Sequence, residues 1–175
     1  MAEPRFWSER LGAQHNRAAF SCGVEPFDRY LRQQAGQEQR RNVAVPYVMV
    51  DTGTGALAGY YTLSAFTIVP ASLPPATSRK LPCYAAYPAI LIGRILLVDA
   101  LGCCLDLSAE IGAIAVVVDA KDEAARAFYE HLRFLRRLDN DGRLYIPMAT
   151  IERELRAVAA GGAEAGPPLQ AGRPE

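Results

Sequence analysis

The segment that most constrains the fold is a short run of β-branched residues that passes directly into a helix-forming sequence. Residues 116–118 are all valine, and such a run predicts a buried strand. The run stops at Asp119, and either Asp119 or Asp122 can cap the helix that we expect next, with Glu123 favourably placed in its first turn. The segment therefore predicts a core strand followed at once by a helix.

The predicted helix has one apolar side. Ala124, Phe128 and Leu132 recur at helical spacing and form the stripe that we expect to face the core. Tyr129 lies one residue round from this stripe, at its edge, where its phenol could reach a cleft. On spacing alone, we expect a half-buried aromatic ring with a hydrated hydroxyl group.

The order of elements along the chain predicts an α+β, or mixed α/β, domain with a mostly antiparallel sheet. A helix opens at Glu25 and Pro26, where proline suits a first-turn position. The other predicted elements are strands at 45–50, 57–69 and 144–148, a turn at 51–55 and a helix at 151–158. We expect residues 1–158 to form a single domain and residues 159–175, rich in glycine, alanine and proline, to be a disordered tail.

Composition excludes several classes of protein. The 19 lysines and arginines balance 19 aspartates and glutamates, so the net charge demands neither nucleic acid nor membrane. Its four cysteines lack zinc-ligand spacing and only two histidines are present, so we expect no metal site. The sequence shows neither a signal peptide nor an apolar run long enough to span a bilayer, which predicts a cytoplasmic protein.

Two groups of basic residues admit two interpretations. Arg29, Arg32 and Arg40 lie on one side of the helix that opens at Glu25, and Arg79 and Lys80 lie in a proline-rich segment. Solvated surface charge is the commoner explanation for such groups. Contact with RNA phosphates is the functional alternative, and the sequence does not separate the two.

Four ordered blocks carry a resemblance to a known family. Residues 118–130 match the pattern VDAK-(D/N)-x-x-A-x-x-FYE, which joins a strand to a helix. The other blocks are Phe20-Ser-Cys22-Gly23 with Phe27-Asp28-x-Tyr30-Leu31, then residues 59–64, then residues 88–94. On these residues the chain resembles the GNAT acyltransferase superfamily and, more narrowly, the GNAT toxins of bacterial toxin–antitoxin pairs.

The resemblance implies an activity and partners. It implies the GNAT acyl-CoA N-acyltransferase fold and transfer of acetyl from acetyl-CoA to the α-amine of an aminoacyl-tRNA, which blocks translation. Tyr129 matches the family tyrosine that acts as general acid toward the departing thiolate. A phenol suits this role because, with a pKa of about 10, it stays protonated at neutral pH. The implied partners are aminoacyl-tRNA, a ribbon–helix–helix antitoxin and a second copy of the chain. The basic residues above would then contact RNA.

The family's phosphate-binding loop is missing. In the family a Q/R-x-x-G-x-G/A loop separates a Gly-Arg pair from a helix containing LL-x-DAL, and its backbone N–H groups hold the pyrophosphate of acetyl-CoA. Here Gly93-Arg94 runs straight into residues 95–101, which match that helix, so the fold is shortened where the fourth strand meets the helix. Alternatively, residues 95–99 end the strand, and Gly102 is the remnant of the loop before a helix of about two turns. Ile92, Gly93, Arg94 and Gly102 are the candidate cofactor-binding residues.

The missing loop bears on function. Losing two or three hydrogen bonds of about 1.5–3 kcal/mol each weakens cofactor binding by orders of magnitude. The alternative function is a cofactor-deficient GNAT-fold remnant that binds antitoxin or RNA without catalysis. A second departure is Arg133-Phe134 in place of the family's Gly-Phe, at a helix end where positive φ favours glycine.

Overall fold

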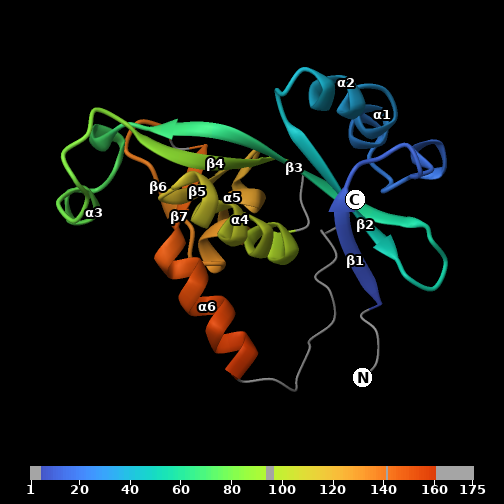
Figure 1. The fold of residues 1–175 in the computed structure, drawn as a ribbon. Helices are drawn as coiled ribbons and strands as arrows, with labels where there is room; N and C mark the ends of the chain where they lie inside the picture. The colour runs from blue at the N-terminus through green and yellow to red at the C-terminus, as the bar shows by residue number, and fades with distance from the viewer. Residues whose placement is uncertain (1–4, 94–96, 141, 161–175) are drawn as a thin grey trace.

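A single twisted sheet forms the centre of the protein (Figure 1). The computed structural model describes residues 5–93, 97–140 and 142–160. Across these residues seven strands pair in the order β1-β2-β3-β4-β5-β7-β6. Their bounds are β1 (Phe6–Arg10), β2 (Val45–Asp51), β3 (Leu57–Ile68), β4 (Tyr87–Gly93), β5 (Ala115–Asp119), β6 (Leu135–Arg136) and β7 (Arg143–Pro147). Only β4 and β5 pair in parallel in this sheet, so the predicted mixed α/β fold with a mostly antiparallel sheet is confirmed.

Helices connect and cover the strands. They are α1 (Glu25–Gln33), α2 (Ala35–Arg40), α3 (Pro75–Ser78), α4 (Leu97–Ile111), α5 (Glu123–His131) and α6 (Met148–Ala160), with 3-10 turns η1 (Arg17–Ala19) and η2 (Pro70–Ser72). In Figure 1, α1 and α2 lie at one end of the molecule and α3 lies at the other. No helix in the described part of the chain is both long and apolar enough to cross a membrane.

The β2–β3 hairpin forms where the sequence predicts it. Asp51 Oδ1 accepts hydrogen bonds from the N–H groups of Gly53 and Thr54, and Gly55 adopts a positive φ of 70°. This local bonding fixes the turn and therefore the register of the two strands. Alternation along β3 then sends Tyr60 and Tyr61 into different hydrophobic clusters.

The core is built from clusters that the sheet separates. The largest joins the central strands to α4, α5 and α6 through Ala100, Tyr129 and Ile151. A second cluster packs α1 and α2 on β2 and β3, and includes Leu31 and Tyr60. Residues 116–118 are fully buried, which confirms the predicted core strand.

Helix α4 decides between the two interpretations of residues 95–104. It runs for fifteen residues from Leu97 to Ile111, so the interpretation with an extended strand and a two-turn helix is wrong. Ala100 and Cys104, one turn apart, are both fully buried, and this helical spacing explains why the helix forms. Gly102 is therefore a helical residue and not a loop remnant. Arg94, with the junction that follows it, lies outside the described residues.

The C-terminal helix is longer than predicted. It begins at Met148, directly after β7, and continues to Ala160, two residues into the segment predicted to be a tail. Residues 161–175 lie outside the described part of the chain. A single domain over residues 1–158 stays a prediction, although all the described strands share one sheet.

Candidate functional site

The candidate site lies where the two parallel strands end. Residues 90–92 of β4 lie opposite residues 116–118 of β5, and the strands then finish at Gly93 and Asp119. Helix α5 starts close by, capped by Asp122, whose Oδ1 accepts a hydrogen bond of 2.7 Å from the N–H of Ala125. Ligands of open α/β sheets bind outside the carboxyl ends of parallel strands. This edge is therefore the natural place for a reaction centre.

Tyr129 is more deeply placed than its spacing predicts. It is 2% exposed and is the buried residue of α5, so its predicted position at the edge of the apolar side is wrong. The inner side runs through Ala125, Tyr129 and Leu132, whereas Ala124 is exposed. The ring of Tyr129 packs on Phe134, with the ring centroids 5.4 Å apart. A small residue such as Ala124 gives little indication of which side of a helix is buried. The buried side of α5 is instead set by the packing of its larger side chains.

The hydroxyl group of Tyr129 is available to donate a hydrogen bond. It has no hydrogen-bond partner among the described residues. Burial raises the pKa of Tyr129 to about 12, and the negative charge of Asp119 adds to the effect. The hydroxyl therefore keeps its proton at neutral pH.

Asp119 faces a cation that the sequence analysis missed. Its Oδ1 accepts a hydrogen bond of 2.6 Å from Nε of Arg143 on β7, while Asp122 takes the helix cap. The guanidinium of Arg143 lies 5.0 Å from the centroid of the Phe66 ring, and that of Arg137 lies 5.5 Å from it. These residues form a wall on the face of the sheet opposite to Tyr129, since Phe66 clusters with Val117 whereas Tyr129 clusters with Val116 and Val118. The available signal was a charged residue at the start of the last strand, just after the turn at Gly142.

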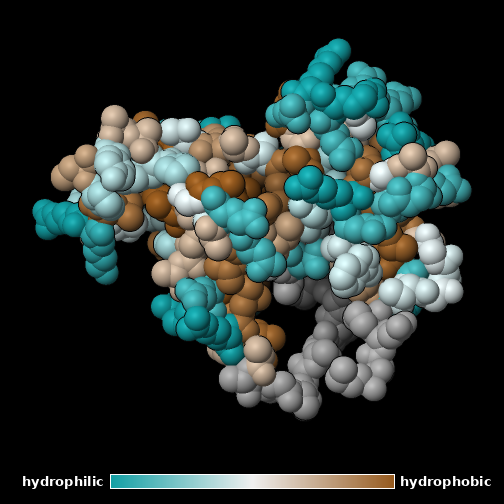
Figure 2. Space-filling view, viewed as in Figure 1, coloured by the Kyte–Doolittle hydropathy of each residue, from teal (hydrophilic) through white to brown (hydrophobic). Residues whose placement is uncertain are grey.

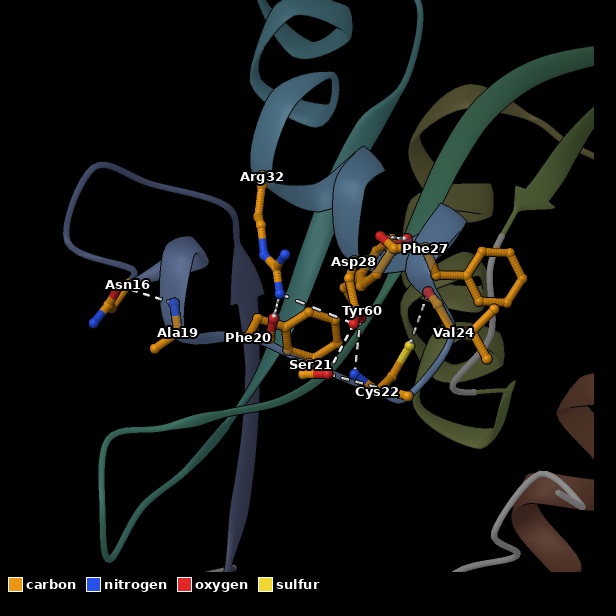
Figure 3. A network of polar contacts seen from close by, with 11 residues as sticks. Asn16, Ala19, Phe20, Ser21, Cys22, Val24, Phe27, Asp28, Arg32 and Tyr60 are labelled. Atoms are coloured by element: carbon orange, nitrogen blue, oxygen red, sulfur yellow. Dashed lines mark hydrogen bonds and ion pairs between the residues drawn. The ribbon is translucent and has the colours of Figure 1, made fainter.

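A second wall is built by the residues before and within α1 (Figure 3). The buried carboxylate of Asp28 accepts hydrogen bonds of 2.8 Å from the N–H of Cys22 and from Oγ of Ser21. Burial alone would raise the pKa of Asp28, but these hydrogen bonds and the charge of Arg32 lower it overall. The network explains the sequence block at residues 20–31 as a scaffold that holds the start of α1.

The start of α1 reaches the segment that follows β5. The hydroxyl of Tyr60 donates a hydrogen bond of 2.9 Å to the carbonyl of Phe27, and Nζ of Lys121 lies 4.5 Å from the Phe27 ring centroid. Figure 3 shows this ring pointing away from the Asp28 network. The α1 wall therefore borders the segment that joins β5 to α5.

The predicted cofactor-binding residues have different places. Ile92 is buried in the main cluster. Gly93 ends β4, and a Cβ there would lie 2.6 Å from Oγ1 of Thr62, so close approach requires glycine. Gly102 lies in the second turn of α4, where its N–H belongs to the helix ladder. Only Gly93 is thus brought to the strand ends by the described structure.

The first turn of α4 carries its own negative charge. Asp99 accepts a hydrogen bond of 3.0 Å from the hydroxyl of Tyr61. Tyr61 is fully buried and stacks on Tyr47 with the rings 5.3 Å apart. Burial first, and then the interactions with neighbouring Cys103 and with the carboxylate of Asp99, raise the pKa of Tyr61, so its proton stays in the bond to Asp99.

The predicted RNA-contact residues form two separate groups. Arg29 and Arg40 on α1 and α2, and Arg79 and Lys80 after α3, are exposed and form no ion pair with any described residue. Arg32 instead donates a hydrogen bond of 2.6 Å to the carbonyl of Phe20. Figure 2 shows hydrophilic surface over α1 and α2 and at the α3 end, with hydrophobic side chains between. The two groups flank the sheet rather than forming one patch.

A shallow hollow lies on the α1 side, away from the strand ends. Its volume is about 390 Å³, and its lining residues are His15, Asn16, Arg17, Ala18 and Arg32. The imidazole of His15 is held by Glu9, 2.8 Å away. The hollow therefore adds basic surface to the α1 side without being part of the candidate site.

Known proteins share both sequence and fold with this chain. No protein-family model matches it. It is 26% identical over 159 residues to a probable toxin TacT of Sinorhizobium fredii, covering 79% of this chain and 88% of that protein. It is 29% identical over 139 residues to a tRNA-acetylating toxin of Mycobacterium tuberculosis, covering 71% of this chain and 81% of the toxin.

Solved structures of toxins share the fold of this chain. AtaT complexed with acetyl-methionyl-tRNAfMet superposes with a TM-score of 0.77 at 24% identity, over 86% of this chain and 99% of AtaT. A mutant AtaT toxin bound to acetyl-CoA and the C-terminus of the antitoxin AtaR gives 0.68 at 21% identity, over 86% of this chain and 98% of the toxin. The GNAT fold is confirmed, and so is the resemblance to GNAT toxins.

Proposed function

We propose that this protein, with the fold and sequence likeness of the tRNA-acetylating toxins, is an N-acetyltransferase. It moves an acetyl group from acetyl-CoA to the α-amine of an aminoacyl-tRNA and so blocks translation. The observation that carries the proposal is the protonated hydroxyl of buried Tyr129 within the electrostatic reach of Asp119, which ends β5. The likeness to a relative named as a tRNA-acetylating toxin supports transfer over a remnant without catalysis.

Among the described residues, the groups that suit acetyl-CoA are those at its thioester end. When bound, it supplies an acetyl thioester. The residues suited to that end, Tyr129 and the edge formed by Gly93 and Asp119, are present. At the nucleotide end the first turn of α4 offers Asp99 where an anion would need donors.

Tyr129 acts through its proton. An amine that is acylated releases one proton, and a departing thiolate takes one up, so the exchange is balanced within the reacting groups. A phenol with a pKa of about 12 does not fully protonate a thiolate whose conjugate acid has a pKa of about 8.5. Tyr129 Oη therefore donates a hydrogen bond to the developing charge and can relay the proton that the amine loses.

The remaining groups have roles in binding. The exposed cations of Arg29, Arg40, Arg79 and Lys80 suit contacts with the tRNA phosphates on both flanks of the sheet. A ribbon–helix–helix antitoxin is the expected protein partner, and the antitoxin-bound AtaT structure supports this. We place the protein in the cytoplasm, where its proposed substrate is found, as one domain that can form a homodimer.

The test is Tyr129→Phe. Transfer of labelled acetyl from acetyl-CoA to a pool of aminoacyl-tRNA should fall about 10²–10⁴-fold, as expected when a positioned proton donor is lost. The free energy of unfolding should change by less than about 0.5 kcal/mol, because the hydroxyl bonds no described residue. Tyr30→Phe is the control for transfer activity alone, since Tyr30 is also buried but lies in the α1–α2 cluster, where its hydroxyl donates a hydrogen bond to Glu38. Retention of most of the activity by Tyr129→Phe would disprove the assignment.

A further inference from the structure

We infer that Arg17 and Arg40 form a clamp that binds one phosphate group of an RNA on the α1 side of the protein, away from the ends of β4 and β5. The inference rests on the proposed function only in naming the RNA, a tRNA whose acceptor end would reach Tyr129. Its basis is the position of two guanidinium groups, which come from separate segments of the chain and converge on Gly36.

The two guanidinium groups share one small space beside α2. Arg17 comes from η1, and Arg40 comes from the last turn of α2. A Cβ atom added to Gly36 would lie 2.9 Å from Nη1 of Arg17 and 3.5 Å from Nη1 of Arg40, so the two Nη1 atoms are no further apart than the sum of these distances. Neither side chain forms a hydrogen bond or ion pair with another residue in the described part of the chain. Two like charges held this close repel each other, and an anion between them would stabilise both.

The surroundings leave these two cations uncompensated. The hollow of about 390 Å³ that Arg17 lines is also lined by Arg32, which is fixed by its hydrogen bond to a backbone carbonyl. Two carboxylates contact the lining, but Glu9 is bound by His15 and Asp28 by the network at the start of α1. The clamp therefore opens on a hollow in which the nearby acidic groups are already engaged.

A phosphate group of RNA suits the clamp better than an acidic segment of a protein does. Guanidinium groups match phosphate oxygens, and each can donate a charge-assisted hydrogen bond of about 2.8 Å. The exposed side chains of α1 and α2 beside the clamp are polar, and they include Arg29, Gln33, Gln37 and Arg41. Figure 2 shows hydrophilic surface over these two helices. Protein interfaces are anchored by aromatic and apolar side chains, whereas RNA is held chiefly through its phosphates.

The clamp lies apart from the proposed centre of transfer. Figure 3 shows Asn16, which caps η1, and Phe27, whose ring contacts Lys121, at opposite ends of the α1 network. Changes to the clamp should therefore alter the binding of RNA and not the chemical step. For aminoacyl-tRNA we expect Arg17→Gln to raise KM and to leave kcat unchanged.

The first experiment measures the binding of pooled deacylated tRNA to the full chain over a range of KCl concentrations. Arg17→Gln and Arg40→Gln should each weaken binding about tenfold, as the loss of a charge-assisted contact does. Because both side chains hold one phosphate, the double variant should reduce the slope of log Kobs against log salt by about 0.7–0.9, the value for a single phosphate. Arg153→Gln, which removes an exposed arginine from α6, is the control and should change the affinity less than about twofold.

Two results would overturn the inference. A slope that falls by about 1.4–1.8 in the double variant would mean that the two arginines contact separate phosphates. If both single variants bind tRNA like the wild type but lose affinity for poly-glutamate, the clamp serves an acidic protein segment and the RNA assignment falls.

The second experiment changes the geometry without changing the charge. Gly36→Ala suits a helix, so the Tm should not fall, but the added Cβ must displace the guanidinium of Arg17. Binding of tRNA should therefore weaken about threefold in the wild-type background and should not weaken further in Arg17→Gln. An equal loss in both backgrounds would contradict the position assigned to Arg17.

The outcomes separate this inference from the proposed function. Weaker tRNA binding by the clamp variants of a chain that transfers no acetyl group would leave the inference standing and overturn the acetyltransferase proposal. Acetyl transfer with the same KM for aminoacyl-tRNA in the wild type and in Arg17→Gln would do the reverse.

Discussion

Removing the buried carboxylate of Asp28 should weaken the whole α1 wall. Asp28 is 3% exposed and accepts two hydrogen bonds of 2.8 Å, from Cys22 N–H and Ser21 Oγ. Hydrogen bonds to a charged group contribute about 1.5–3 kcal/mol each, or about 3–6 kcal/mol together. The ion pair to Arg32, at 3.9 Å, adds less. Since Asp28→Ala also removes the desolvation cost of a buried charge, we expect a net loss of about 3 kcal/mol.

Urea denaturation measures this loss. With a slope of about 2 kcal/mol/M, the unfolding midpoint of Asp28→Ala should fall by about 1.5 M. Asp106→Ala, which removes an exposed aspartate from α4, is the control and should change the free energy of unfolding by less than about 0.5 kcal/mol. A loss below about 1 kcal/mol for Asp28→Ala would refute the view that this network holds the start of α1.

Further predictions concern acid stability and the end of α5. The folded-state pKa of Asp28 is lowered, so its contribution to the free energy of unfolding is complete above its unfolded pKa of about 3.9 and is lost as the pH falls through the lower folded value. The wild type should therefore lose more stability than Asp28→Asn between pH 5 and pH 2 in urea titrations. Parallel curves for the two proteins would contradict this. Arg133→Gly should stabilise the protein by about 0.5–1 kcal/mol and raise the Tm by about 1–4 °C, because Arg133 has a φ of 68°. Arg133→Ala keeps the strain and should give no gain in the same thermal melts.

Local signals explain what the sequence predicted well. The turn at residues 51–55 depends on bonds between Asp51 and its near neighbours. The positive φ predicted where Arg133 replaces a family glycine is confirmed, and two hydrogen bonds close the helix there: Arg133 N–H to Glu130 and Phe134 N–H to Tyr129, each 3.0 Å. Such features need only a few adjacent residues, so a single sequence reveals them.

Partners distant in sequence explain what was missed. Either Asp119 or Asp122 was predicted to cap α5, and Asp122 does so. Asp119 instead bonds Arg143, 24 residues away, because β5 and β7 pair side by side. Arg32 was predicted to face RNA, yet it is partly used to hold the carbonyl of Phe20. The depth of Tyr129 likewise depends on Phe134, which returns to the helix only after the chain turns at Arg133.

The single parallel pairing in the sheet also governs the order in which the molecule can assemble. The β2–β3 and β6–β7 hairpins join strands that follow one another along the chain, so each can close locally. By contrast, β4 and β5 can meet only after α4 has crossed between them, as every parallel pair requires. Contacts between residues far apart in sequence form slowly, because the chain loses conformational entropy before the contacts stabilise the fold. We therefore expect the two halves of the sheet to join last, at a rate that depends on how readily α4 forms.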